Sequence, residues 1–178
     1  MALMELTVGV VSDLHCHHSS NGYAETLLLT DAPRIPRTHH PVSALLDLIS
    51  NENLRAEVML MPGDITNKVD PQGMISGWGF TREIAEALGA STIAATLGNH
   101  DVISRIPSDD PFSLPRNLYP QFPVAQTAAF DEFWSKGFCH IESEMFRLKS
   151  ERFMQPCPVR GRQNIRSVRG CFWRRGIS

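Results

Sequence analysis

Three short polar segments stand where apolar runs of the sequence end: Asp13-Leu14-His15, Gly63-Asp64 and Gly98-Asn99-His100-Asp101. They offer carboxylate, imidazole and amide groups, which are ligand types that suit divalent metal ions. In an open α/β sheet, ligands placed after the strands meet at the carboxyl edge of the sheet. A pair of divalent ions held there can act on phosphate esters. The spacing therefore predicts a metal site for phosphoester chemistry.

Four of these residues are candidate metal ligands. In an extended chain, side chains two residues apart point the same way, so Asp13 and His15 can reach one ion together. A glycine before Asp64 lets the backbone turn sharply, and both oxygens of that carboxylate could then bridge two ions. Asn99 offers a neutral carbonyl oxygen. A structural interpretation of the first two segments stays open, since Asp caps turns and Gly-Asp is a common turn dipeptide.

The last segment also carries a candidate acid–base pair. A carboxylate beside an imidazole fixes its tautomer and raises its basicity, so His100 with Asp101 could transfer a proton or bind phosphate. A turn accounts for Gly-Asn but gives no reason for His-Asp to follow. Thr66 and Asn67, which follow Asp64 closely, are expected to steady their loop by bonding its backbone.

The elements that must position these residues alternate along the chain. Apolar runs predict strands at residues 7–12, 57–61 and 91–97, the first of them central and buried on both faces. Helical spacing of apolar residues predicts helices at residues 41–50 and 80–88. The order predicts an α/β fold with a parallel sheet.

Glycine and proline residues indicate where the connecting segments lie. Residues 70–79 contain Pro and three Gly and are expected to form a loop. Prolines favour irregular structure over residues 106–123. A helix is expected over residues 127–149, with a break at Gly137.

The three polar segments, in this order and each closing a strand, resemble the signature of the calcineurin-like metallophosphoesterase family: D-x-H, then G-D, then G-N-H-[DE]. The resemblance covers residues 6–101. It implies a fold of two β-sheets sandwiched between helices, and a centre of two divalent ions (Mn, Fe or Zn). The metal ligands that it implies are Asp13 and His15 on the first ion, Asp64 between both, and Asn99 on the second.

The resemblance also implies how such a centre acts. Two ions roughly 4 Å apart lower the pKa of a water molecule between them and clamp the phosphoryl oxygens. His100 would stabilise or protonate the leaving group, and Asp101 would support it.

The family signature continues with an isolated His and a G-H-x-H motif, and here the sequence departs from it. After Asp101 only His140 follows, where a packing or surface role on the expected helix is the simpler interpretation. The second ion would therefore lack imidazole ligands. The predicted fold class is an α/β, metallophosphoesterase-type β-sandwich flanked by helices, incomplete at the C-terminus.

Charge divides the chain into a domain at residues 1–150 and a basic tail at residues 151–178. All 19 acidic residues lie at or before Glu151, whereas residues 152–178 carry seven Arg, no Lys and no acidic residue. The tail has no period suited to a helix or strand, and we expect either disorder or out-of-frame translation after a frameshift near codon 150. The alternative is a nucleic-acid-binding tail, in which Arg holds phosphates and Phe172 and Trp173 stack on bases.

The cysteines and the remaining histidines bear on the cellular compartment and on further site residues. The four cysteines form no CxxC pair, and without a signal peptide or transmembrane segment they are expected to stay reduced in the cytoplasm. Cys16-His17-His18 and His39-His40 could add an accessory metal site or line the mouth of the main one. Residues 19–40 and 106–123 are the expected specificity elements.

Three functions follow from these observations. The first is hydrolysis of phosphate mono- or diesters by a dinuclear centre, manganese among the candidate metals, on a small-molecule or nucleotide substrate and with no membrane partner. The second is a truncated, non-catalytic fragment that binds at most one ion weakly. The third is a nucleic-acid-binding module that uses the basic tail. Oligomeric state is not encoded in any motif.

Overall fold

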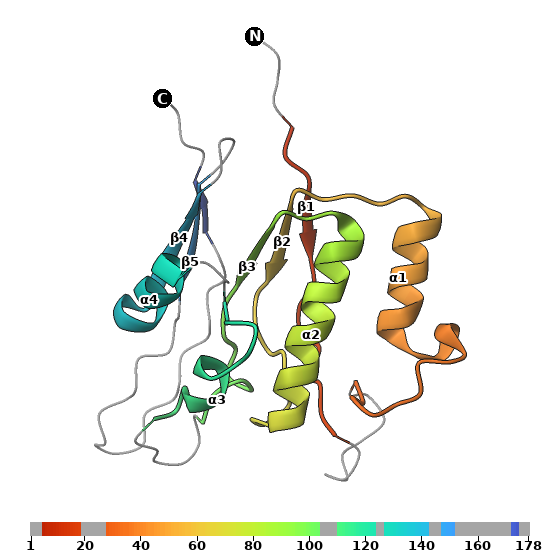
Figure 1. Ribbon diagram of the computed structural model, residues 1–178, viewed down its shortest axis with the longest axis horizontal. Coiled ribbons are helices and arrows are strands. Elements are labelled where there is room, and N and C mark those ends of the chain that lie inside the picture. The colour runs from red at the N-terminus through yellow and green to blue at the C-terminus, as the bar shows by residue number, and fades with distance from the viewer. Residues whose placement is uncertain are drawn as a thin grey trace.

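Three parallel strands form the sheet that carries the polar segments. The computed structural model describes residues 5–18, 28–103, 110–123, 127–142, 147–151 and 172–174. The first sheet contains β1 (Val8–Val10), β2 (Val58–Met61) and β3 (Thr92–Ala95), in the order β1-β2-β3. Both strand pairs are parallel, so all three strands end at one edge (Figure 1). The predicted α/β fold with a parallel sheet is confirmed.

Two helices connect these strands and pack against each other (Figure 1). They are α1 (Pro41–Asn51), preceded by the short 3-10 helix η2 (Arg37–His39), and α2 (Pro71–Leu88). Val42 and Ile49 of α1 share a buried cluster with Met59 of β2 and Ile84 of α2. The first predicted helix is thus confirmed, and its apolar stripe faces the core as its spacing requires.

The expected loop at residues 70–79 is wrong, because α2 already begins at Pro71. Oδ1 of Asp70 accepts a hydrogen bond from the Gly73 amide at 2.6 Å and so caps the helix. Proline suits the first turn, where its missing N–H is not needed. A Cβ on Gly73 would lie 2.0 Å from the Cys16 carbonyl oxygen. The glycine therefore serves close packing of α2 against the loop after β1, and it does not break the helix.

A second, antiparallel sheet lies beside the first. It contains β4 (Phe138–Glu142), β5 (Arg147–Glu151) and β6 (Phe172–Arg174), in the order β4-β5-β6. The Ser150 hydroxyl on β5 donates a hydrogen bond to the Ala95 carbonyl oxygen on β3, which joins the two sheets. Three tail residues thus form a strand where no strand period was evident, and the other residues from 152 onward lie outside the described ones.

The helix expected over residues 127–149 ends early. The helix α4 (Thr127–Lys136) stops before Gly137, whose φ is 83°. From there Cys139 and Ile141 are buried while His140 between them is partly exposed, which is the alternation of a strand. Burial after Gly137 therefore alternates with a period of two. A strand stands where the second half of the expected helix was predicted.

Aromatic rings from α2, from α4 and from the segment between β3 and α4 pack together. Of the proline-rich segment at residues 106–123, residues 106–109 lie outside the described ones, and residues 110–123 are irregular apart from the four-residue helix α3 (Ser113–Arg116). Its Phe122 is fully buried and meets the rings of Trp78 and Phe133 at centroid distances of 5.0 and 6.1 Å. These rings join α2 and α4 to the core that holds β2 and β3.

The first strand is not the doubly buried central strand that its composition predicts. Among the described residues β1 pairs with β2 alone, and the exposed fractions of Val8 and Val10 are 40% and 60%. A Cβ on Gly9 would lie 3.0 Å from Leu88, so the glycine faces the helices and both valines face the opposite side. The apolar run at residues 7–12 therefore belongs to a strand that is buried on one face only. No helix in the described part of the chain is long and apolar enough to cross a membrane.

The buried N-cap of α1 makes stability depend on pH. Nδ1 of His40 accepts a hydrogen bond from the Ser43 amide, and the ring is 1% exposed. Burial and the neighbouring Arg34 hold the pKa of His40 below its usual value. The unfolded chain therefore binds more protons than the folded one as the pH falls below about 6.5, and the free energy of unfolding falls with it. We expect His40→Asn, which keeps a capping acceptor without titrating, to flatten this dependence in urea unfolding between pH 7.5 and 5.5. Equal slopes for both proteins would contradict the assignment.

Candidate metal centre

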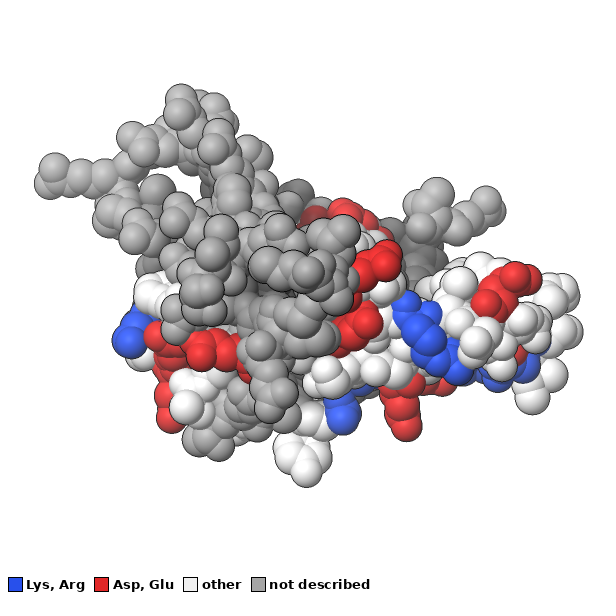
Figure 2. All heavy atoms as spheres, turned by 90° about the horizontal axis from the view of Figure 1, so that it is seen from above, with Lys and Arg blue, Asp and Glu red and all other residues white. Residues whose placement is uncertain are grey.

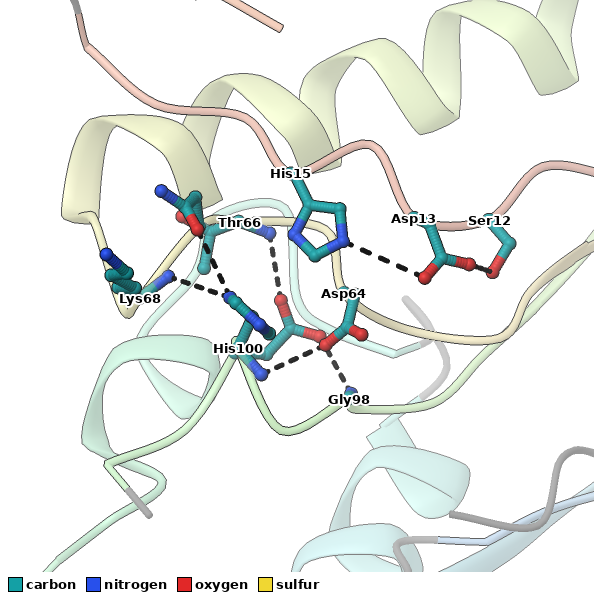
Figure 3. A network of polar contacts seen from close by, with 10 residues as sticks. Ser12, Asp13, His15, Asp64, Thr66, Lys68, Gly98 and His100 are labelled. Atoms are coloured by element: carbon teal, nitrogen blue, oxygen red, sulfur yellow. Dashed lines mark hydrogen bonds and ion pairs between the residues drawn. The ribbon is translucent and has the colours of Figure 1, made fainter. Parts of the chain in front are cut away.

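Three of the four predicted metal ligands converge at the carboxyl edge of the sheet. Asp13 and His15 lie in the loop after β1, and Asp64 lies in the loop after β2. One ligand atom from each lies within 4.8 Å of the other two. Nε2 of His15 is 3.8 Å from Oδ1 of Asp13, and Figure 3 shows the three side chains turned toward a common space.

The donor set and its spacing fit a divalent cation. Two carboxylates and an imidazole suit Mn²⁺, Fe²⁺ or Zn²⁺. The 3.8 Å between Asp13 and His15 is too long for a hydrogen bond. Atoms bound to one ion at roughly 2.1 Å lie roughly 3 to 4 Å apart, which matches this separation. These three residues can therefore hold one ion.

All three ligands have an unusual backbone conformation. The φ angles of Asp13, His15 and Asp64 are 57°, 45° and 53°, in the left-handed region that non-glycine residues rarely adopt. Such residues each carry roughly 1–2 kcal/mol of strain, and such strain concentrates at functional sites. The side chains of Asp13 and His15 are thus brought together by two left-handed residues. The extended chain expected from their spacing is not what aligns them.

Two glycines allow the loops after β2 and β3 to touch. A Cβ on Gly63 would lie 2.4 Å from the Gly98 amide nitrogen, and one on Gly98 would lie 2.1 Å from Oδ1 of Asp64. Across the same contact the His100 amide donates a hydrogen bond to Oδ1 of Asp64 at 2.9 Å. The third segment therefore holds the carboxylate of the second in place.

The ring of His100 lies against the metal ligands. Its centroid is 4.7 Å from that of His15, in an edge-to-face arrangement. Nδ1 of His100 lies 3.2 Å from Oδ1 of Asn67 and accepts from the Lys68 amide at 3.4 Å. Asn67 was expected only to steady its own loop. Its contact with the His100 ring was not predicted. The one hint in the sequence is that this polar residue follows closely after Asp64.

The carboxylate of Asp101 is fully buried and bonds to backbone. Its Oδ1 accepts from the Thr66 amide at 2.9 Å, and its Oδ2 accepts from the Gly98 amide at 2.8 Å. Burial raises the pKa of Asp101 to about 7, against the lowering effect of these hydrogen bonds. Both oxygens thus accept hydrogen bonds from backbone amides of the loops after β2 and β3. The predicted support of the His100 imidazole by Asp101 stays a prediction. Asn99 lies partly exposed in the same turn, and its role on a second ion also stays a prediction.

The accessory metal site is not assembled among the described residues, where Asp13, His15 and Asp64 form the single group with ligand spacing. Cys16 is fully buried, and burial raises the pKa of its thiol to about 12, so it stays protonated. His17 is buried as well, and His40 is the N-cap of α1. His140 lies on β4 instead of the expected helix, partly exposed, and its Nδ1 is 3.6 Å from Oε2 of Glu132 on α4.

A family model for the calcineurin-like phosphoesterases matches residues 6–164. The chain belongs to this family, and the resemblance seen in its three polar segments is confirmed. The match includes β4 and β5 and continues into the tail. A comparison with curated proteins gave no match. The family is metal-dependent and acts on phosphoester bonds, and the Asp13, His15 and Asp64 group supplies a possible metal site for that chemistry.

Proposed function

We propose that this chain hydrolyses phosphate mono- or diesters at a centre of two divalent ions. Asp13 and His15 would hold the first ion, Asp64 would contact both, and Asn99 would hold the second. The observation that carries the proposal is the convergence of Asp13, His15 and Asp64 in a chain of this family. We further propose that the two sheets form the β-sandwich of the family, flanked by helices.

The bound ions and the side chains have separate roles in the proposed reaction. Bound ions supply positive charge for the phosphoryl oxygens and lower the pKa of water. Backbone hydrogen bonds from the Asp13 and His15 amides to the loop after β2 join the two loops that carry Asp13, His15 and Asp64, so little reorganisation would be needed when substrate binds. Nδ1 of His100 is engaged by Asn67 and the Lys68 amide. We therefore assign transfer of a proton to the leaving oxygen to Nε2 of His100.

A non-catalytic role is the second candidate, and one observation favours it. The described residues contain one three-residue metal group, which is enough for a single ion, and the only His after Asp101 pairs with Glu132. A chain that binds one ion would lack the second charge on the phosphoryl group. Counting the bound ions therefore separates the two candidates.

We propose a small-molecule or nucleotide phosphoester as the substrate. A nucleic-acid interface needs a basic face. The described part of the end opposite to the site, seen from above, shows acidic and basic side chains side by side (Figure 2). The described part of this face therefore shows no basic patch, and most of the basic tail lies outside the described residues.

Removal of metal tests the proposed activity. We expect Mn²⁺ to support hydrolysis of p-nitrophenyl phosphate or bis(p-nitrophenyl) phosphate, a chelator to abolish it, and added Mn²⁺ to restore it, because the ions supply the charge that stabilises the transition state. Calorimetric titration of the chelated protein should give two ions per chain. One ion or none, with no turnover, would leave the non-catalytic candidate.

A further inference from the structure

A buried carboxylate connects two of the loops that form the metal centre. Asp101 is fully buried, and each of its oxygens accepts a hydrogen bond from a different loop. The Thr66 amide belongs to the loop after β2, and the Gly98 amide belongs to the loop after β3.

Both hydrogen-bond donors are adjacent to groups of the metal centre. Thr66 follows Asp64 by two residues, and Gly98 lies so close to Asp64 that a Cβ on it would overlap the carboxylate. The Asp101 amide also donates to the Gly98 carbonyl oxygen at 3.3 Å, which closes the turn that carries Asn99 and His100. A shift of either loop would therefore move Asp64 relative to the His100 amide that bonds to it.

An Asp side chain is well suited to this position because it offers two oxygen acceptors. Both donors are backbone amides, so each oxygen satisfies one N–H group. A carboxamide of the same size has one oxygen and one NH₂ group. It would face one of the two amides with a donor, and one loop would lose its partner.

We propose that Asp101 is a positioning residue, which fixes the spacing of the loops after β2 and β3 and thereby keeps Asp64 in its metal-binding position. This inference rests on the proposed function for its consequence in turnover, but its direct readout is metal affinity. The role differs from the support of the His100 imidazole expected from the sequence, because Asp101 acts here through the backbone.

The test compares Asp101→Asn with Ile84→Val in the full chain. Ile84 is buried in the cluster between α1 and α2, so its truncation lowers stability without touching the loops. We expect Asp101→Asn to weaken Mn²⁺ binding 10- to 100-fold, the range found for groups that orient metal ligands, and Ile84→Val to leave it within twofold. The readouts are calorimetric Mn²⁺ titration and urea unfolding, both at low temperature. A folded Asp101→Asn protein with the Mn²⁺ affinity of the parent would overturn the proposal.

Hydrogen exchange of the unmodified chain keeps the proposal testable when Asp101→Asn does not fold. The amides of Thr66 and Gly98 lie outside helices and strands, yet we expect them to exchange as slowly as amides of β2. Exchange as fast as that of exposed loop amides would overturn the coupling. Weakened Mn²⁺ binding by Asp101→Asn in a chain without turnover would support Asp101 as a positioning residue and count against the proposed hydrolysis.

Discussion

Replacement of Asp64 by Asn is expected to slow hydrolysis roughly a thousandfold while the protein stays folded. This carboxylate is the proposed metal ligand from the loop after β2, and it is the residue proposed to contact both ions. Asn has the same shape and can still accept from the His100 amide, but it removes the negative charge that holds the cations. Losing about 4 kcal/mol of transition-state stabilisation corresponds to this factor.

Stability should move in the opposite direction. Burial is the main cause that raises the pKa of Asp101, and the nearby negative charge of Asp64 raises it further, as expected for two carboxylates that repel each other. Asp64→Asn removes this repulsion, so the unfolding midpoint in the absence of metal is expected to stay equal or to rise. Such an exchange of stability for activity is common at active sites.

Asp131→Asn is the matched control, since Asp131 is exposed on α4 and the change in charge is the same. The measurements are kcat/KM for an aryl phosphate ester with Mn²⁺, and urea unfolding of the chelated proteins. The control should retain full activity. Turnover of Asp64→Asn within tenfold of the parent would show that this carboxylate does not hold the catalytic ions.

Local sequence was enough to predict the sheet and the polar residues at its edge. The apolar runs before Asp13, Asp64 and Gly98 are short and β-branched or aliphatic, and helical spacing separates them, so a parallel sheet with its polar residues at one edge follows. The convergence of Asp13, His15 and Asp64 then depends only on strand order. Residue type and the alternation of elements carry this information along the chain.

The partners of His100 and Asp101 could not be predicted in the same way. The His100 ring meets Asn67, and Asp101 meets the Thr66 amide, across sequence separations of more than thirty residues. Two neighbouring residues, His and Asp, were expected to pair with each other. The contacts seen are those of the His100 ring with Asn67 and of the Asp101 carboxylate with the Thr66 and Gly98 amides, and the pairing of His100 with Asp101 stays a prediction. Such contacts depend on backbone angles that residue types alone do not fix.

Glycine was the residue most easily misinterpreted. By residue type Gly73 predicts a helix break, but in α2 it marks the place where the helix touches the Cys16 carbonyl oxygen. At Gly63, by contrast, the expected sharp turn is present, with φ at 114°. Only the surroundings distinguish a glycine needed for its backbone angle from one needed for its lack of a side chain.

Gly98→Ala is expected to disable the metal centre by contact alone. The added Cβ would lie 2.1 Å from Oδ1 and 2.5 Å from the amide nitrogen of Asp64. Neither atom can give way easily, because Oδ1 is held by the His100 amide and the backbone of Asp64 by that of His15. The loops after β2 and β3 must therefore separate. We expect a loss of about 1–3 kcal/mol in the free energy of unfolding and Mn²⁺ binding too weak to measure at millimolar concentration.

Gly79→Ala separates this contact from the general effect of removing a glycine. Gly79 lies within α2, and nothing stands within 4 Å of a Cβ placed on it. Alanine there gains helix propensity, so the same substitution is expected to raise the free energy of unfolding by roughly 0.5–1 kcal/mol and to leave Mn²⁺ binding unchanged. Urea unfolding and Mn²⁺ titration of both variants give opposite signs in stability and a difference in binding confined to Gly98→Ala. If Gly98→Ala bound Mn²⁺ as the parent does, the close approach of the two loops would not be what keeps Asp64 in its metal-binding position.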